Sequence, residues 1–297
     1  MEIKKVGVIG CGLMGHGIVQ VAAQAGCEVI ALEGDQGALD KGLARIENSL
    51  GKMGARAVKK GKQTEAEAAA FAKQTLGRIS GSLKQADLAD CDLIVEAIIE
   101  DLEIKKKLFA ELGAICKPET ILASNTSSFP IAEMAAASGR PGRFVGLHFF
   151  NPVQLMRLVE VVSTDATEAD VFASAKAFGK AVGKAPVSCK DTPGFVVNRL
   201  LVPFMAQSLL MLDRGDASAE DIDTAMMYGC GHPMGPITLT DYVGLDTTLS
   251  ILEGWVERYP NEPAFIIPKV LKTKVAEGKL GRKSGEGFFK WEGDQKV

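Results

Sequence analysis

His148 and Glu160 are the residues of this sequence whose types and settings best suit acid–base chemistry. His148 directly follows the apolar run 145–147, so it is expected at the end of a strand. Glu160 lies inside the apolar run 158–162, where a buried carboxylate needs a partner, although an edge strand would leave it facing water. A carboxylate behind an imidazole fixes the tautomer and stabilises the protonated ring. Such a pair suits a general base that takes the proton of an alcohol while a hydride leaves the carbon.

Residues 10–15, Gly-Cys-Gly-Leu-Met-Gly, directly follow an expected strand and directly precede an expected helix. Glycine at these three positions allows a tight turn and a close approach of the backbone to a pyrophosphate, which the N–H groups at a helix start bind. The pattern therefore predicts a dinucleotide site. The residues expected to bind the cofactor here are Gly10, Gly12, Leu13, Met14 and Gly15.

Glu33 is expected to end the next strand, 18 residues beyond Gly15. A carboxylate at that point accepts hydrogen bonds from the adenosine ribose and repels a 2′-phosphate, so the predicted cofactor is NAD rather than NADP. Asp35 is the alternative acid. His16, in the first helical turn, is expected to support the cofactor site through its neighbours.

A polar cluster, Ser-Asn-Thr-Ser-Ser at 124–128, follows another expected strand. In doubly wound sheets the ligand crevice lies outside the carboxyl ends of the strands, so this cluster and His148 are expected at the same edge. Its hydroxyls can donate to a substrate oxygen or to a ribose. The cluster can equally be an ordinary polar turn or helix cap.

The composition excludes several classes of protein. A net charge of −3 gives no electrostatic reason to expect nucleic acid, and no apolar run reaches the roughly 18 residues of a membrane span. The six cysteines form no short metal-ligand spacing, so no metal site is expected. No signal or transit peptide is recognisable at the N-terminus, which predicts a cytoplasmic protein, although a processed mitochondrial matrix form would look the same.

Short apolar runs alternate with helix-length segments over the first two-thirds of the chain. They predict a doubly wound, parallel sheet of the Rossmann type, with strands at 6–9, 29–32, 93–97, 121–124 and 145–147. Two further strands are expected at 157–163 and 185–188. About 60 residues separate the second and third runs, and residues 37–73 are expected to form an inserted helical hairpin that breaks near Gly61.

From residue 191 onward the pattern is helical. Residues 191–194 are expected to open one helix, Ser218 to cap a second that stops near Gly229, and Pro236, Asp246 and Pro268 to begin three more. The predicted domains are therefore 1–190, with the helical insertion at about 37–73, and an all-α domain at 191–297.

The order and spacing of seven motifs resemble the L-3-hydroxyacyl-CoA dehydrogenase family, of the 3-hydroxybutyryl-CoA dehydrogenase type. The likeness covers essentially the whole chain. The motifs lie at 10–15, 124–128, 148–152 (His-Phe-Phe-Asn-Pro), 191–199 (Asp-Thr-Pro-Gly-Phe-Val-Val-Asn-Arg), 231–236, 241–246 and 281–288.

This resemblance implies a reversible, NAD-dependent oxidation of (S)-3-hydroxyacyl-CoA to 3-oxoacyl-CoA, with short chains such as 3-hydroxybutyryl-CoA preferred. It implies a role in fatty acid metabolism such as β-oxidation, and a homodimer formed through the C-terminal domain. His148 matches the family's base and Glu160 its partner, while Ser127 and Asn198 match residues that contact the 3-oxygen and the thioester region. Positions near the nicotinamide end of NAD are matched by Glu100, Lys105, Ser127, Asn151 and Lys283.

In the inserted helices, Ser49 and Arg56 fall where the family contacts CoA. The family often has Lys at the position of Arg56 and Asp at that of Glu33, so both are departures that keep the charge. Lys52, Arg56 and Lys60 are spaced by four and line one helix face, which would attract the phosphates of CoA. A plain solvated basic face is the alternative.

Two other functions stay open from the sequence. One is oxidation of a free hydroxy or sugar acid, as in gulonate dehydrogenase relatives, which would use His148 and Glu160 but leave the basic face idle. The other is a non-catalytic NAD-binding structural protein, against which the joint presence of His148, Glu160, Ser127 and Asn198 argues. The residues themselves do not fix acyl length or physiological direction, and the pathway could be β-oxidation, butyrate or polymer metabolism, or aromatic degradation.

Overall fold

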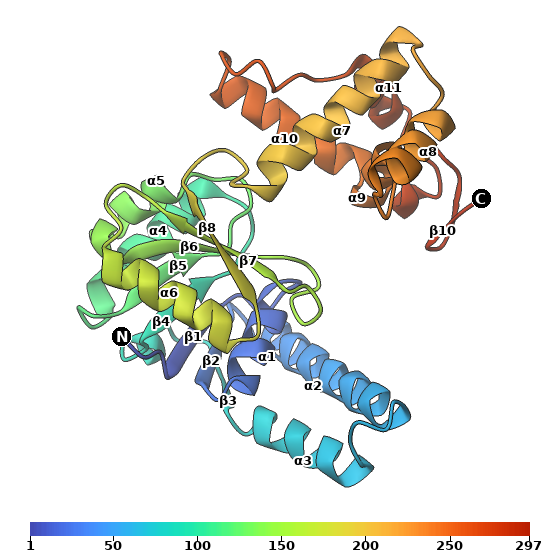
Figure 1. The fold of residues 1–297 in the computed structure, drawn as a ribbon. Coiled ribbons are helices and arrows are strands. Elements are labelled where there is room, and N and C mark those ends of the chain that lie inside the picture. The colour runs from blue at the N-terminus through green and yellow to red at the C-terminus, as the bar shows by residue number, and fades with distance from the viewer. The chain divides into compact units, whose positions relative to one another are not determined.

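Runs of Val, Ile and Leu form the strands of an eight-stranded sheet in the computed structural model, which describes all 297 residues (Figure 1). The strand order is β3-β2-β1-β4-β5-β6-β7-β8. The central strands are buried on both faces, as continuous apolar sequences require. The strands are β1 (Lys5–Ile9), β2 (Glu28–Leu32), β3 (Ile79–Ser82), β4 (Leu93–Glu96), β5 (Ile121–Ser124), β6 (Phe144–Phe149), β7 (Leu158–Ser163) and β8 (Ala185–Lys190).

The Rossmann-type sheet agrees with the expectation, except for one extra strand and the direction of another. Strand β3, which pairs in parallel with β2, was not expected, because its Ile-Ser-Gly-Ser sequence has no apolar run. Strand β7 runs antiparallel to β6, whereas every other adjacent pair in this sheet is parallel, so the sheet is mostly rather than wholly parallel. The antiparallel register places His148 directly opposite Glu160.

Helices cover both faces of the sheet. One apolar core cluster includes Ile18 of α1 (Gly15–Gln24) and Val171 of α6 (Ala169–Ala181), and the second includes Phe109 of α4 (Leu102–Ile115) and Met134 of α5 (Ile131–Ala137). Each cluster excludes water from one side of the central strands, and this burial is the main force that holds the strand ends in place. Two short 3₁₀ helices, Gln85–Leu88 and Pro141–Arg143, lie in the connections.

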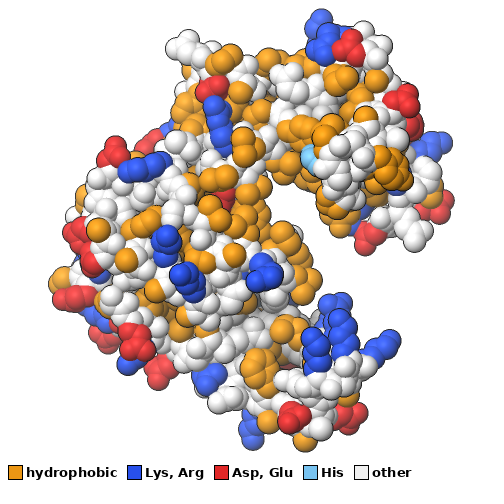
Figure 2. All heavy atoms as spheres, in the orientation of Figure 1, with side chains coloured by type: hydrophobic (Ala, Val, Ile, Leu, Met, Phe, Trp, Pro, Cys, Tyr) orange, Lys and Arg blue, Asp and Glu red, His pale blue; other side chains and the backbone are white.

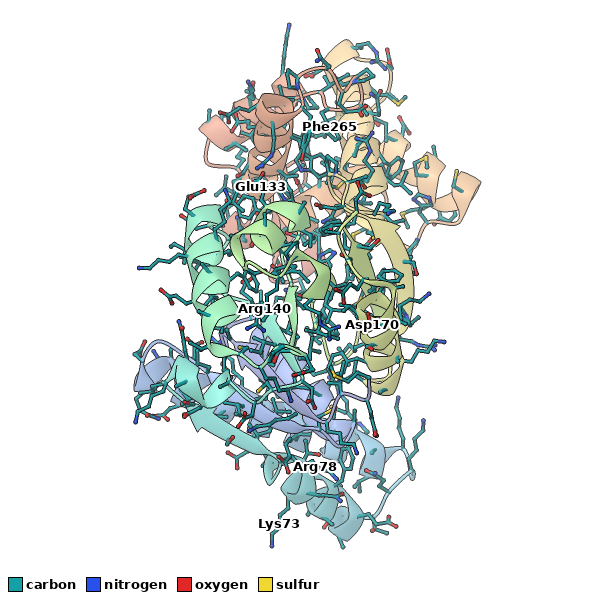
Figure 3. All side chains as sticks on the ribbon, turned by 90° about the vertical axis from the view of Figure 1, so that its left-hand side faces the viewer. Lys73, Arg78, Glu133, Arg140, Asp170 and Phe265 are labelled. Carbon is teal, nitrogen blue, oxygen red and sulfur yellow. The ribbon has the colours of Figure 1, made fainter.

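The inserted hairpin is formed by α2 (Gln36–Lys59) and α3 (Glu65–Leu76), as the sequence indicated (Figure 1). Asp35 caps α2 by accepting a hydrogen bond from the N–H of Ala38, so the alternative acid of the cofactor site has a structural partner. Arg78, at the base of the hairpin, donates to the carbonyl oxygen of Ala23 at 3.1 Å, and Lys73 points outward from α3 (Figure 3).

The chain divides into two compact units, Met1–Phe195 and Val196–Val297. The second unit is helical around its own apolar cluster, which includes Leu209, Ile237 and Trp255. It consists of α7 (Val197–Arg214), α8 (Ala219–Cys230), α9 (Pro236–Val243), α10 (Leu245–Arg258), α11 (Lys269–Ala276), the 3₁₀ helix Arg282–Ser284, and a small hairpin of β9 (Trp291–Glu292) and β10 (Gln295–Lys296).

Two expectations about helix ends were wrong. The carboxylate of Asp191 does not open the helix that follows it but accepts hydrogen bonds from the N–H groups of Ile131 and Ala132, at the start of α5. Helix α8 stops at Gly231 rather than at Gly229, since Gly231 is the residue in the left-handed conformation, with φ of 70°. None of the helices combines the length and the apolar sequence that a membrane span requires.

Helix α2 packs so closely on the glycine-rich loop at residues 10–15 that Gly42 is required at the contact. A Cβ atom on Gly42 would lie 2.4 Å from the Cβ of Cys11 and 2.9 Å from its carbonyl oxygen. We expect Gly42→Ala to lower the free energy of unfolding by about 1–3 kcal/mol, because helix and loop must separate. Urea denaturation measures this.

Gly51→Ala is the matched control on the same helix, since its Cβ would meet nothing within 4 Å. It should raise the free energy of unfolding by about 0.5–1 kcal/mol through helix propensity alone. Equal stability of the two variants would contradict the packing argument.

Candidate active site

The buried pair formed by His148 and Glu160 lies at the carboxyl end of β6. Nδ1 of His148 is 2.6 Å from Oε2 of Glu160, and the side chains are 8% and 0% exposed. Glu160 lies on an inner strand, between β6 and β8, so it does not face water. Phe150 and Phe195 pack near the imidazole, with ring centroids 4.5 and 5.6 Å away.

This contact determines what the imidazole can do. A carboxylate accepts hydrogen bonds, so Nδ1–H donates to Glu160 and Nε2 carries the lone pair. The aromatic rings limit the positions that the ring can adopt, and the carboxylate stabilises the imidazolium that forms when Nε2 takes a proton. The pair therefore has the chemistry of a general base.

The glycine-rich loop between β1 and α1 has the shape that a pyrophosphate requires. Gly10 has φ of 90°, and a Cβ on Gly15 would lie 1.6 Å from the carbonyl oxygen of Gly10. A Cβ on Gly12, in contrast, would meet nothing within 4 Å, so open space lies beside that backbone. No side chain caps the N-terminus of α1, which leaves its positive dipole end for an anion. The loop fits a dinucleotide.

Glu33 follows β2 and reaches back to this loop. Its Oε1 accepts a hydrogen bond from the N–H of Cys11 at 2.5 Å, which places the carboxylate beside the loop. Burial, reinforced by the charge of Glu33, raises the pKa of the Cys11 thiol to about 12. The thiol is therefore neutral near pH 7 and adds no negative charge where a pyrophosphate would bind.

A network of buried charges connects the ends of β4 and β5. Glu96 is fully buried: its Oε1 accepts from Nζ of Lys105 at 2.5 Å and from the N–H of Ile98, and its Oε2 accepts from Oγ of Ser124 at 2.6 Å. Lys105 is 1% exposed and also lies 3.0 Å from Oε2 of Glu100. One lysine between two carboxylates satisfies the charges that burial would otherwise penalise.

Glu100 in turn holds the polar cluster that follows β5. Its Oε1 accepts from the hydroxyls of Thr126 and Ser128, at 2.5 and 2.9 Å, and from the N–H of Ser127 at 3.2 Å. Burial alone would raise the pKa of Glu100, but the charge of Lys105 and these hydrogen bonds outweigh it, and the pKa is lowered. Ser127 has an exposed side chain, so its hydroxyl faces outward from a backbone fixed by Glu100.

The other predicted site residues are placed as follows. Asn151 is exposed on the segment that follows β6. Asn198 and Lys283 lie in the second unit, where Asn198 is half-buried in the first turn of α7 and Nζ of Lys283 lies 2.5 Å from Oδ1 of Asp246. The structure brings His148 to Glu160 and Lys105 to Glu100. The roles of Ser127, Asn151, Asn198 and Lys283 toward a ligand stay predictions.

A cationic cavity of about 310 Å³ lies along α2 within the first unit. Ser49, Lys52 and Arg56, which were predicted to contact CoA, all line it, whereas Lys60 does not. Figure 2 shows Lys and Arg side chains gathered along this hairpin. The complete lining is His16, Arg45, Asn48, Ser49, Lys52, Met53, Arg56, Pro152, Gln154 and Leu155.

Two of the residues that shape these sites were missed by the sequence reasoning. Glu96 ends the apolar run 93–96, and a charge at the end of a buried strand is the same signal that singled out Glu160. Arg45 stands four residues before Ser49 and seven before Lys52, a spacing that keeps it on the same helix face. The pattern of basic residues spaced by four, at 52, 56 and 60, does not include Arg45.

Comparisons with known proteins match both units. Residues 5–192 match the family model for the NAD binding domain of 3-hydroxyacyl-CoA dehydrogenase, and residues 194–291 match the model for its C-terminal domain. The chain is 50% identical to the mitochondrial hydroxyacyl-coenzyme A dehydrogenase of Rattus norvegicus, over 97% of this chain and 91% of that protein. It is 48% identical to a probable 3-hydroxybutyryl-CoA dehydrogenase of Deinococcus radiodurans, over 97% of this chain and 100% of that protein.

Among solved structures, (S)-3-hydroxybutyryl-CoA dehydrogenase from Ralstonia eutropha aligns with a TM-score of 0.90 and 39% identity, covering 98% of this chain and 100% of that one. The glycine-rich loop, the histidine–carboxylate pair and the helical second unit thus occur in a chain that matches both family models over residues 5–192 and 194–291. The chain belongs to the 3-hydroxyacyl-CoA dehydrogenase family, a family of NAD-dependent oxidoreductases.

Proposed function

We propose that this enzyme interconverts (S)-3-hydroxyacyl-CoA and 3-oxoacyl-CoA, with short chains such as 3-hydroxybutyryl-CoA and acetoacetyl-CoA as its preferred substrates. The observation that carries the proposal is the 2.6 Å contact between the buried imidazole of His148 and Glu160 at the ligand edge of the sheet. The preference for short chains is supported by the relatives from Deinococcus radiodurans and Ralstonia eutropha, which are named for 3-hydroxybutyryl-CoA.

His148 is the group that moves the proton. In the oxidation, its Nε2 accepts the proton of the 3-hydroxyl as a hydride leaves C3, and in the reduction it returns that proton to the new alkoxide oxygen. Bound NAD supplies the hydride acceptor. Glu160 keeps the proton of Nδ1 in place and stabilises the charged ring in both directions.

Other residues of the chain position the reactants. We assign Ser127 and Asn198 to the 3-oxygen and the thioester region, where a hydroxyl and an amide can donate to oxygen. Glu100, Lys105, Asn151 and Lys283 are assigned to the nicotinamide end of NAD. The support for the first two is their ion pair, in which Lys105 is buried and Glu100 fixes the backbone N–H of Ser127.

The cationic cavity along α2 supports a CoA thioester over a free hydroxy or sugar acid. CoA carries several phosphate charges, and Arg45, Lys52 and Arg56 line the cavity without any carboxylate. A free acid would leave these cations without a ligand. The pathway we propose is fatty acid metabolism such as β-oxidation, and the cytoplasmic location stays a prediction.

We also propose that the enzyme is a homodimer through its second unit. Tyr228 is 84% exposed, and Tyr242 and Val243 of the same unit are also exposed, so this unit presents large apolar side chains that a partner could bury. Ile222 and Leu252 of the same unit pack inward and do not contribute to such a surface.

The proposed base is tested by His148→Gln. The wild-type enzyme should oxidise NADH with acetoacetyl-CoA, and the variant should lose about 10²- to 10⁴-fold in kcat, because a positioned general acid–base contributes that much. NADH affinity, measured by fluorescence titration, should persist. An unchanged kcat would remove His148 from the mechanism.

Glu160→Gln is the companion variant. Its amide can donate to Nδ1 and so favours the wrong tautomer, and we expect kcat to fall by about 10²-fold or more.

A chain-length series of kcat/KM values on the wild-type enzyme tests the preference for short acyl chains. Equal activity toward long chains would contradict the preference for short ones.

The choice of NAD over NADP is tested at Glu33. We expect Glu33→Ser to raise the ratio of kcat/KM for NADP to that for NAD by about tenfold, equal to about 1.4 kcal/mol, because the charge that repels a 2′-phosphate is gone. Asp35→Ala is the control: it removes the carboxylate that caps α2, so stability should fall by about 1 kcal/mol while the ratio stays. A ratio that responds to Asp35 instead would reverse the assignment.

The oligomeric state is tested by light scattering coupled to size exclusion. We expect a mass near twice the 31.5 kDa of one chain, because burial of the exposed apolar side chains favours association. A mass of one chain across the micromolar range would rule out the dimer.

A further inference from the structure

We propose that His16 is a proton-dependent ligand for the phosphates of the CoA substrate, so that affinity for a CoA thioester falls as pH rises. This inference rests on the proposed function, because it takes the cavity along α2 as the site of the CoA phosphates. It gives His16 a role that is separate from the chemistry at His148.

The cavity brings His16 together with the cationic face of α2. His16 lies in the first turn of α1, and it shares the 310 Å³ cavity with Arg45, Lys52 and Arg56. All four residues belong to the first unit. An anion that enters the cavity therefore meets three permanent cations and one imidazole.

The orientation of the ring is set by its hydrogen bond to the glycine-rich loop. Nδ1 of His16 lies 2.7 Å from the carbonyl oxygen of Gly12. A carbonyl oxygen only accepts, so Nδ1–H is the donor and Nε2 is the atom left for a ligand. In the neutral ring Nε2 has only a lone pair, which repels a phosphate oxygen, whereas in the charged ring it donates to one.

His16 is the only histidine that lines the cavity. The other charged side chains in the lining are Arg45, Lys52 and Arg56, all from α2. The third wall, formed by Pro152, Gln154 and Leu155, contributes no charge. Histidine is the residue type that ordinarily loses its proton between about pH 5 and 8.

The sign of the pH effect follows from linkage. A phosphate that prefers the protonated ring binds tighter where the ring is protonated, and its binding promotes proton uptake. The KM for a CoA thioester should therefore rise with pH across this range. The 3′-phosphate of CoA also titrates, with a pKa of about 6, as phosphate monoesters do. The test therefore compares protein variants with the same substrate, so that the titration of the substrate is common to both.

The experiment measures KM at saturating NADH from pH 5.5 to 8.5, for acetoacetyl-CoA and for acetoacetyl-pantetheine, which lacks the phosphates. The quantity compared is the ratio of KM for the CoA substrate to KM for the pantetheine substrate. In the wild type this ratio should rise between pH 5.5 and 8.5, because deprotonation of His16 removes a charge-assisted hydrogen bond. The rise should be about tenfold larger than in His16→Gln. Acetoacetyl-dephospho-CoA then shows which phosphate His16 contacts, because it lacks only the 3′-phosphate.

Arg45→Gln is the matched control, because it removes a permanent cation from the same cavity. It should raise the KM ratio at every pH and keep the pH dependence of the wild type. His16→Gln should instead lose that dependence and leave the KM for the pantetheine substrate unchanged.

Two results would overturn the proposal. One is a His16→Gln variant with the pH dependence of the wild type. The other is a variant whose main defect is weaker NADH binding, which would make His16 only a support for Gly12. If the wild type binds NADH but fails to reduce acetoacetyl-CoA at any pH, the proposed function is wrong instead, so the two failures are distinct.

Discussion

The contact between His148 and Glu160 depends on a single reversal of strand direction. Because β7 runs antiparallel to β6, residues 148 and 160 are partners in the register, and both side chains point to the same face. A parallel strand at that position would place a different residue beside the imidazole. The buried carboxylate is tolerated because the imidazole gives it a hydrogen-bond partner, and the imidazole has one defined tautomer because the carboxylate is there.

Glu96 fixes the neighbouring loops through hydrogen bonds to a buried carboxylate, as Glu160 fixes the imidazole. It is held by Ser124 at the end of β5, by the N–H of Ile98 after β4, and by Lys105 from α4. Three segments that are separate in sequence thus meet at one carboxylate. Since Lys105 also contacts Glu100, the position of the 124–128 cluster depends on a charge that never reaches the surface.

Much of this arrangement could be predicted from the sequence, because its signals are local. Continuous runs of Val and Ile indicated the central strands, and the glycine pattern followed by Glu33 indicated the dinucleotide loop. The antiparallel direction of β7 was not predicted, although the eight residues 150–157 between β6 and β7 are too few for a parallel crossover. Strand β3 was not predicted because pairing with β2, rather than its own apolar content, makes it a strand.

The parts that could not be predicted depend on contacts between residues distant in sequence. Asp191 caps α5, which begins about 60 residues earlier in the chain, and no local pattern shows that. The role of Asp241 is of the same kind: it accepts from the N–H groups of Phe288 and Phe289 and from Nε1 of Trp291, which fixes the C-terminal segment of the second unit. His16 likewise belongs to the α2 cavity through the packing of two helices, whereas the sequence related it only to the cofactor.

The neutral thiol of Cys11 limits the reactivity of the cofactor loop toward oxidants and alkylating reagents. Peroxides and alkylating reagents react with thiolates, and burial, which raises the pKa of the Cys11 thiol to about 12, keeps this side chain in the thiol form near pH 7. A cysteine in the middle of the cofactor loop is therefore chemically inert, and it fills the space under Gly42 like a small aliphatic residue. The exposed Cys230, in the second unit, is the thiol that such reagents can reach.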